Sequence, residues 1–326
     1  MNPISRVLLI AGCMLAVAGA PGAVAQPSYP ASTIRLVVPF AAGGAPDIVA
    51  RNIAQRLATR VGQSVIVENR LGAGGNIAYE AVSRSRPDGY TLVLATTGIA
   101  TNVSLYRELP YDPLKDFAPV TLVSRSPHVL VAQPSLPVNS IADLISLAKS
   151  KPGSITYGSA GTGTILHLAG ELLNIKTGIA LMHVPYRGNT LALNDLLGGS
   201  IQLLFSDIAS AVPQIKGGKL KAIAVTGEQR IQSLPDVPTV AESGVPGYAI
   251  EAWFGILAPA GTPQPIIARL NRELTAILSE QDLKAKMLHL GLELGGNSPE
   301  AFGSFLASEV KKMGDIAKTA GIPFQD

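Results

Sequence analysis

A glycine-containing segment, residues 39–51, combines residue types that suit the binding of an anion. Gly43 and Gly44 let the backbone adopt positive φ and approach another molecule closely. Pro46 suits the first position of a helix, and Asp47 suits the positive end of the helix dipole. A strand, a glycine loop and a helix N-terminus in this order direct backbone N–H groups at an anion. A tight strand-to-helix connection that binds no ligand is the alternative.

A second loop, residues 157–164, interleaves glycines with hydroxyl side chains between an expected strand and an expected helix. Its backbone N–H groups and its Ser and Thr hydroxyls suit a carboxylate. A glycine turn followed by Thr164 as a helix N-cap is the structural alternative. His167 comes one turn into the helix, where it either donates to a bound anion or packs against its own lobe.

Other polar side chains stand where further strands end. Thr97 follows one strand of the first series, and Arg187 follows a strand of the second. Arg187 either pairs with a carboxylate or lies solvated on the surface. Asp207 either caps the next helix or reaches a ligand, whose amino or hydroxyl group it would suit.

The sequence lacks the patterns of several enzymes and cofactor sites. The Gly43 loop has neither the lysine nor the spacing of a phosphate-binding loop, and Ile77 stands where a dinucleotide fingerprint needs its third glycine. No G-x-S-x-G motif is present, because Tyr157 precedes Ser159 at the first glycine position. The four histidines show no metal-ligand spacing. We therefore predict no cofactor and no metal, and nothing in the sequence requires catalysis.

The loops are carried by short apolar strands that alternate with helices, which indicates βαβ units and sheets covered on both faces. The expected strands are residues 34–38, 64–68, 91–96, 155–159, 182–184, 201–205 and 221–225. The expected helices are residues 47–61, 76–85, 141–150, 164–176, 191–197 and 208–216. Apolar stripes at helical spacing predict two more helices, around residues 266–278 and 302–310.

Two longer apolar segments, residues 118–133 and 251–259, are expected to be strands that carry the chain into and out of a second lobe. The predicted fold class is therefore α/β with two lobes. Lobe 1 comprises residues 26–124 and 251–326, and lobe 2 comprises residues 125–250. A cleft between two such lobes is a usual place for a small-molecule site.

The N-terminus has the features of a secretory signal peptide, predicted as residues 1–25. Arg6 precedes an apolar core, residues 7–18, and Ala23-Val24-Ala25 forms a cleavage site. The predicted location is the periplasm, with a lipoprotein anchored at Cys13 as the alternative. The formal net charge of +3 is spread over 326 residues without a basic cluster, which argues against a nucleic-acid partner.

Several motifs occur in the order found in one known family. They are Pro39-Phe40 with Gly43-Gly44 and Asp47-Ile48-Val49-Ala50-Arg51, Val67-Glu68-Asn69-Arg70 with Gly72-Ala73-Gly74-Gly75-Asn76, Pro87-Asp88-Gly89-Tyr90, Tyr157-Gly158-Ser159-Ala160-Gly161-Thr162-Gly163, His183-Val184-Pro185-Tyr186-Arg187-Gly188, and Leu234-Pro235-Asp236-Val237-Pro238-Thr239. Over its whole mature length the chain resembles the substrate-binding proteins of tripartite tricarboxylate transporters, also called the Bug family of periplasmic receptors.

This resemblance implies a type II periplasmic-binding-protein fold that closes on its ligand, and two membrane permease subunits as partners. It also implies that a ligand carboxylate sits on two glycine loops, one from each lobe. The loop residues implied are Phe40, Ala42, Gly43 and Gly44 in lobe 1, and Ser159, Gly161, Thr162 and Thr164 in lobe 2. Thr97, His167 and Asp207 are candidates for the far end of the ligand, and Asp207 is expected to bear on ligand choice.

The resulting hypothesis is a monomeric extracytoplasmic receptor that captures a small carboxylate for such a transporter and does no chemistry. Di- and tricarboxylates, acidic amino acids and aromatic acids all fit a pair of anion-binding loops. A ligand sensor that docks to a signalling partner is one alternative, and a secreted hydrolase is another.

Overall fold

The computed structural model describes residues 29–324, nearly all of which belong to one compact unit, Ser32–Asp326. The predicted signal peptide, residues 1–25, and Cys13 within it lie outside the described residues.

The first sheet has six strands in the order β11-β4-β10-β3-β1-β2. Their bounds are β1 (Ile34–Val38), β2 (Val65–Asn69), β3 (Thr91–Thr96), β4 (Phe117–Ser126), β10 (Ala252–Pro259) and β11 (Glu293–Leu294). Strand β1 pairs in parallel with β2 and β3, whereas β10 runs antiparallel to β3 and β4. Every residue of β3 is buried, as expected of an apolar strand in the middle of a sheet with helices on both faces.

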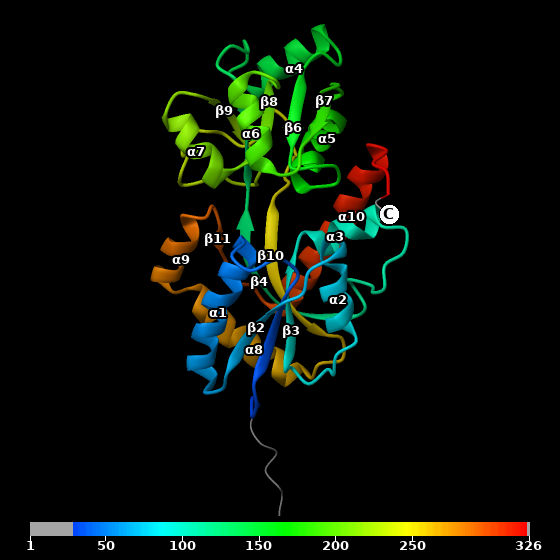
Figure 1. Cartoon of the computed structure of the whole chain (residues 1–326), viewed down its shortest axis with the longest axis vertical. Helices are drawn as coiled ribbons and strands as arrows, with labels where there is room; N and C mark the ends of the chain where they lie inside the picture. Colours follow the sequence, from blue (N-terminus) through cyan, green and yellow to red (C-terminus); the bar gives the residue numbers. More distant parts are fainter. Residues whose placement is uncertain (1–28, 325–326) are drawn as a thin grey trace, which may run out of the picture. The chain divides into compact units, whose positions relative to one another are not determined.

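Two groups of helices cover this sheet, one on each side (Figure 1). Helix α1 (Ala45–Val61) packs against α8 (Gln264–Leu278) on one side, and α3 (Gly98–Leu105) packs against α10 (Pro299–Thr319) on the other. Helix α2 (Asn76–Ser83) contacts β3, and α9 (Gln281–Leu288) contacts β11. A short 3₁₀ helix, η2 (Ala73–Gly75), leads into α2.

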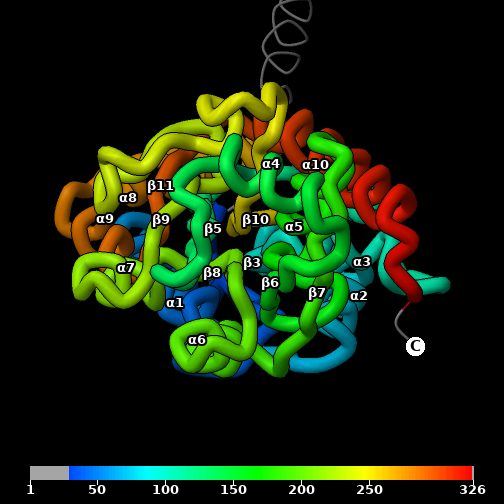
Figure 2. Tube along the Cα trace, turned by 90° about the horizontal axis from the view of Figure 1, so that it is seen from above, coloured from blue at the N-terminus to red at the C-terminus, as the bar shows by residue number. Residues whose placement is uncertain are grey.

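The second sheet has five strands, which run from β9 on the left to β7 on the right in Figure 2. Its strands are β5 (His128–Ala132), β6 (Thr156–Ser159), β7 (Met182–Pro185), β8 (Leu203–Asp207) and β9 (Lys221–Val225). Strand β6 pairs in parallel with β7 and β8, and β5 runs antiparallel to β8 and β9. The helices of this part are α4 (Ile141–Ser150), α5 (Ile165–Thr177), α6 (Asn189–Gly198) and α7 (Ile208–Lys216).

The fold is the predicted α/β fold with two lobes, each built around one sheet. Every strand and helix expected in the two α/β series is present, with ends that differ by no more than two residues. The expected single apolar strand over residues 118–133 is wrong, because Pro127 separates β4 in the first sheet from β5 in the second. Proline has no N–H to continue a ladder of hydrogen bonds, so the chain changes sheet there.

Helices α3 and α9 and strand β11 were not predicted. Each of these two helices has only eight residues, so neither shows a clear apolar stripe in the sequence. Strand β11 has only two residues and pairs with the edge of β4.

An ion pair joins the two strands that connect the sheets. Nη1 of Arg125, near the end of β4, lies 2.6 Å from Oε1 of Glu251, which precedes β10. Burial raises the pKa of Glu251, while the guanidinium of Arg125 acts in the opposite direction. The ring of Phe305 on α10 lies 4.7 Å from the guanidinium carbon of Arg125. The crossing point between the lobes is therefore packed and charge-paired.

Gly170 on α5 provides a test of packing in the second lobe. A Cβ atom at this position would lie 2.2 Å from Cε2 of the buried Tyr157 ring. We expect Gly170→Ala to lower the free energy of unfolding by about 1–3 kcal/mol, because the ring has to shift in a filled core. Gly198→Ala is the matched control, since nothing lies within 4 Å of its Cβ position at the end of α6. Urea unfolding of both variants measures the difference, and equal stability of the two would contradict the packing described.

Candidate functional site

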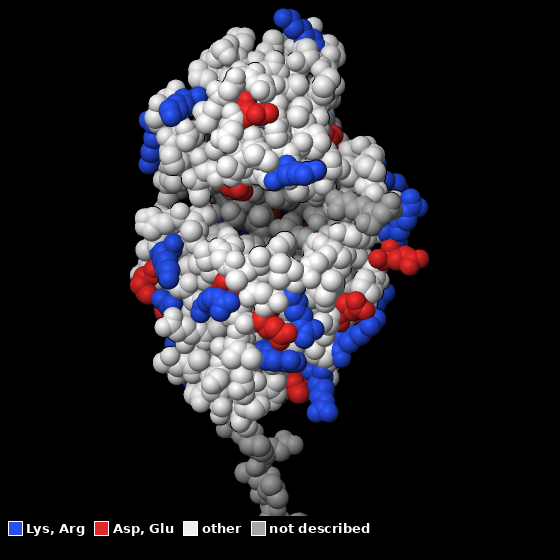
Figure 3. All heavy atoms as spheres, in the orientation of Figure 1, with Lys and Arg blue, Asp and Glu red and all other residues white. Residues whose placement is uncertain are grey.

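One cavity of about 570 Å³ is lined by residues from both lobes. It is lined by Phe40, Ala41, Gly44, Pro46, Thr96, Thr97, Gly98, Thr101, Gly163, Thr164, Ile165, Ala252 and Phe254. Figure 3 shows a hollow between the parts of the molecule that carry the two sheets, and the walls visible there are mostly uncharged. The cavity joins the start of α1 in one lobe to the start of α5 in the other, so the two predicted glycine loops meet at one place.

The predicted site residues divide into two groups. Phe40, Gly44, Thr97 and Thr164 line the cavity. The others lie outside its lining: Ala42, Gly43, Ser159, Gly161, Thr162, His167 and Asp207. Most of this second group belongs to the same two loops or supports them.

Asp47 organises the first loop. Its Oδ2 accepts the backbone N–H of Gly43 at 2.9 Å and the Nε–H of Arg51 at 2.9 Å. Asn69 donates to Oδ1 of Asp47 and to the carbonyl oxygen of Phe40, at 2.9 Å in each case. The hydrogen bond from Arg51 is the main reason that the pKa of Asp47 is lowered to about 2, although burial opposes it. Asp47 therefore holds the shape of the loop, and the N–H of Gly43 is used inside the protein.

The first turn of α1 has backbone N–H groups that can donate to a ligand. The helix begins at Ala45 with Gly44 as N-cap, and the first N–H groups of a helix have no acceptor within it. Pro46 has no N–H, so Ala45 is the first donor of this turn. Backbone donors at the positive end of a helix suit an anionic group.

The second loop is organised in the same manner, by histidines in place of a carboxylate. The N–H of Gly163 donates to Nδ1 of His167 at 3.0 Å. The N–H of Gly161 donates to Oγ of Ser159 at 3.1 Å, and that oxygen lies 2.6 Å from Nε2 of His183. Helix α5 starts immediately after Thr164, so its first turn faces the cavity where Thr164 and Ile165 line it.

The rings of His167 and His183 stack with their centroids 3.8 Å apart. Burial lowers the pKa of each to about 4, so both are neutral at pH 7. Because Nδ1 of His167 accepts a hydrogen bond, its proton is on Nε2, which lies 3.7 Å from Oε1 of Glu171. These contacts favour the alternative in which His167 packs within its own lobe and supports the loop.

The apolar wall of the cavity was not predicted from the sequence. Ala252 and Phe254 alternate along β10, so both side chains project from the same face of the sheet. Next to them, the N–H of Trp253 donates to Oγ1 of Thr97 at 2.9 Å, and its indole Nε1–H donates to Glu309 on α10. The alternation in residues 252–254 is the signal that could have identified these lining residues.

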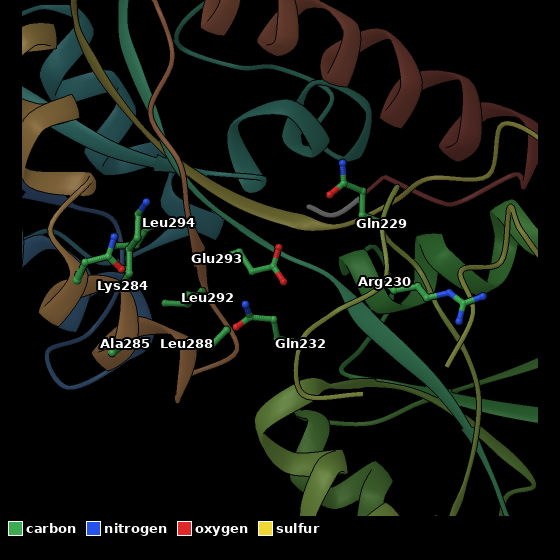
Figure 4. A pocket seen from close by; sticks show the side chains of 10 residues that line it. Gln229, Arg230, Gln232, Lys284, Ala285, Leu288, Leu292, Glu293 and Leu294 are labelled. Carbon is green, nitrogen blue, oxygen red and sulfur yellow. The ribbon is translucent and has the colours of Figure 1, made fainter. Parts of the chain in front are cut away.

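A second cavity, of about 490 Å³, lies between the loop that follows β9 and the α9–β11 segment. Figure 4 shows the side chains of Gln229, Gln232 and Glu293 around it, with Lys284 on the α9 side. None of the predicted site residues and neither glycine loop lines this cavity. Its lining is therefore suited to control substitutions.

Among residues 29–324, no three His, Cys, Asp or Glu side chains are grouped so that they could hold a metal ion. None of the helices described is long and apolar enough to cross a membrane.

Comparison with known proteins gives consistent matches. Residues 49–322 match the family described as "Tripartite tricarboxylate transporter family receptor". The protein BugT of Bordetella pertussis is 35% identical over 319 residues, which cover 97% of this chain and 98% of BugT. The solved structure of R. palustris Rpa4515 with adipate is 40% identical, covers 91% of this chain and 100% of its own, and has a TM-score of 0.74. MatC from Rhodopseudomonas palustris with bound malate is 34% identical, with coverages of 88% and 99% and a TM-score of 0.70.

The buried histidines predict a pH dependence of stability. His167 is neutral in the folded protein down to about pH 4 but has a pKa near 6.5 when unfolded. Its contribution to stability is therefore complete above pH 6.5 and is lost as the pH falls towards 4. We expect His167 to account for a loss of about 2 kcal/mol between pH 7 and pH 5.

Urea unfolding at several pH values, for the unaltered protein and for His167→Gln, measures this contribution. The control is His289→Gln, which replaces an exposed histidine. A pH dependence that is the same in all three proteins would show that His167 takes up its proton as readily in the folded as in the unfolded chain.

Proposed function

Because the chain belongs to the tripartite tricarboxylate transporter receptor family, we propose that it is an extracytoplasmic receptor that captures a small carboxylate for a transporter of that class. The observation that carries this proposal is the cavity bordered by the starts of both α1 and α5. Two helix N-termini that meet at one place provide backbone donors for one carboxylate without a cationic side chain. The adipate and malate found in two relatives belong to the same chemical class.

The proposed site consists of the two glycine loops. Phe40, Ala42, Gly43 and Gly44 form the first, and Ser159, Gly161, Thr162 and Thr164 form the second. Thr97 and Asp207 lie towards the far end of the ligand, whereas His167, which sequence reasoning placed there as well, supports the second loop. Contacts from both lobes to one ligand stabilise the state in which the lobes are closest. Closure therefore follows from binding, because an open form lacks half of these contacts.

The proposal includes a location and partners. The predicted signal peptide directs the chain to the periplasm, where it meets membrane permease subunits as a monomer. A docking partner that signals is the alternative, and it would use the same liganded form.

We propose binding without catalysis. Ser159 and His183 are close enough to act as a nucleophile and its base, since Oγ and Nε2 lie 2.6 Å apart. However, Ser159 is fully buried, and its Oγ also contacts the backbone of Gly161. A hydroxyl that no substrate can reach does not act as a nucleophile, so this pair is better explained as support for the loop.

Gly44→Val tests the site. Gly44 has an ordinary negative φ of −75°, and its Cβ position has only van der Waals neighbours, so a valine fits the backbone but fills the cavity beside the start of α1. Gly43 is less suitable because its φ of 84° strains any residue with a Cβ.

We expect a carboxylate from a panel that includes adipate and malate to stabilise the unaltered protein by about 2.7 kcal/mol at a hundred times its dissociation constant. We expect Gly44→Val to weaken that binding at least tenfold, while Gln232→Ala in the second cavity leaves it unchanged. Thermal shifts and titration calorimetry measure both. Binding that Gly44→Val leaves intact, or binding of sugars or cations but of no carboxylate, would contradict the proposal.

A further inference from the structure

Asp207 stands at the same edge of the second sheet as the loop that starts at Ser159. Strands β6 and β8 are parallel neighbours, with Gly158 opposite Leu204, so their carboxyl ends lie side by side. Both strands therefore end towards the part of the lobe that carries the second glycine loop. The carboxyl edge of a parallel sheet is where such folds present side chains to ligands.

The Asp207 side chain does not cap the helix that follows it. Asp207 is the N-cap residue of α7, yet its carboxylate makes no capping hydrogen bond. About half of the side chain is exposed, so it is accessible to another molecule. The alternative that Asp207 is present to cap a helix is therefore not supported by its contacts.

His128 holds the carboxylate in place. The two residues are opposite each other in the β5–β8 pairing, and Nε2 of His128 lies 3.5 Å from Oδ1 of Asp207. His128 is almost completely buried, and its Nδ1 has no partner among the described residues. The contact with Asp207 is therefore made through Nε2 of the imidazole.

This arrangement leaves Asp207 negatively charged. Removal of water around the carboxylate raises its pKa, but the interactions with His128 together outweigh that effect, and the pKa lies below its ordinary value. Asp207 is therefore ionised at pH 7 and presents a carboxylate at the end of β8.

We propose that Asp207, positioned by His128, makes this receptor select carboxylates that carry a donor group, above all an ammonium, at the end away from the glycine loops. This rests on the proposed function, which places the ligand carboxylate at the starts of α1 and α5. No charged side chain lines the cavity in the described part of the chain, so a second carboxylate on the ligand would lack a cation there. If the ligand extends to the carboxyl end of β8, this second carboxylate would also be repelled by Asp207. An ammonium in that position is attracted instead, and its N–H groups can donate to the oxygens of the Asp207 carboxylate.

Matched ligands that differ only at the far end test the inference. The six-carbon set is 6-aminohexanoate, hexanoate and adipate, and the four-carbon set is 4-aminobutanoate, butanoate and succinate. We expect the amino acid to bind at least tenfold more tightly than the dicarboxylate in at least one set, as measured by titration calorimetry. A tighter dicarboxylate in both sets, or no binding by either amino acid, would overturn the inference.

Asp207→Asn removes the charge and keeps the shape of the side chain. We expect it to reduce the preference for the amino acid over the dicarboxylate at least tenfold. Asp236→Asn makes the same change of charge at an exposed residue outside the cavity and should leave the preference unchanged. We expect His128→Gln to reduce the preference less than Asp207→Asn does, because it misplaces the carboxylate without removing it.

The outcomes separate this inference from the proposed function. If carboxylates bind but the preference is absent or is unaffected by Asp207→Asn, the receptor function stands and the role of Asp207 is wrong. If no carboxylate of either set or of the wider panel binds, both are wrong.

Discussion

The site depends on two polar side chains that each take up a backbone N–H of their own glycine loop. Asp47 accepts from Gly43, and His167 accepts from Gly163. A glycine loop without such an anchor has many conformations and loses much entropy when it becomes ordered. Because each anchor is buried and connected to further polar groups, both loops have their shape before any ligand arrives. The donors at the start of α1 and α5 are then fixed in direction as well.

The two anchors differ in chemistry for a physical reason. At the start of α1 the anchor is the carboxylate of Asp47, which accepts hydrogen bonds from Arg51 and Asn69. The positive charge of Arg51 weakens the repulsion between this carboxylate and a bound anion. At the start of α5 the anchor is an imidazole that burial keeps neutral and that stacks on His183. The half of the site in lobe 2 therefore adds no negative charge at the loop itself. The combined result is a cavity whose described lining has no charged side chain but in which two helix dipoles favour an anion.

Much of this arrangement could be predicted from the sequence, because it depends on local patterns. The order of strand, glycine loop and helix predicted both loops. The alternation of strands and helices predicted two α/β lobes. Two features could not be predicted. The first feature is the set of hydrogen bonds that Asp47 and His167 make, because these form only when each loop folds back onto the side chain. Asp47, for example, accepts from Asn69, which is 22 residues away. The change of sheet at Pro127 was missed because residues 118–133 are largely apolar, and hydrophobicity alone does not show which sheet a strand joins.

The uncharged lining connects binding to closure. A carboxylate in an open cleft keeps its water and gains little from a few N–H groups, since these groups are also solvated. In the proposed closure, water leaves the cleft, and the same N–H groups act in a medium of lower polarity, where their interaction with the charge is stronger. The strand that forms the apolar wall, β10, also connects the lobes, and Trp253 on it contacts both Thr97 in the cavity wall and Glu309 on α10. In the proposed closure, a ligand that packs against Ala252 and Phe254 would therefore contact the strand by which the chain returns from the second sheet to the first.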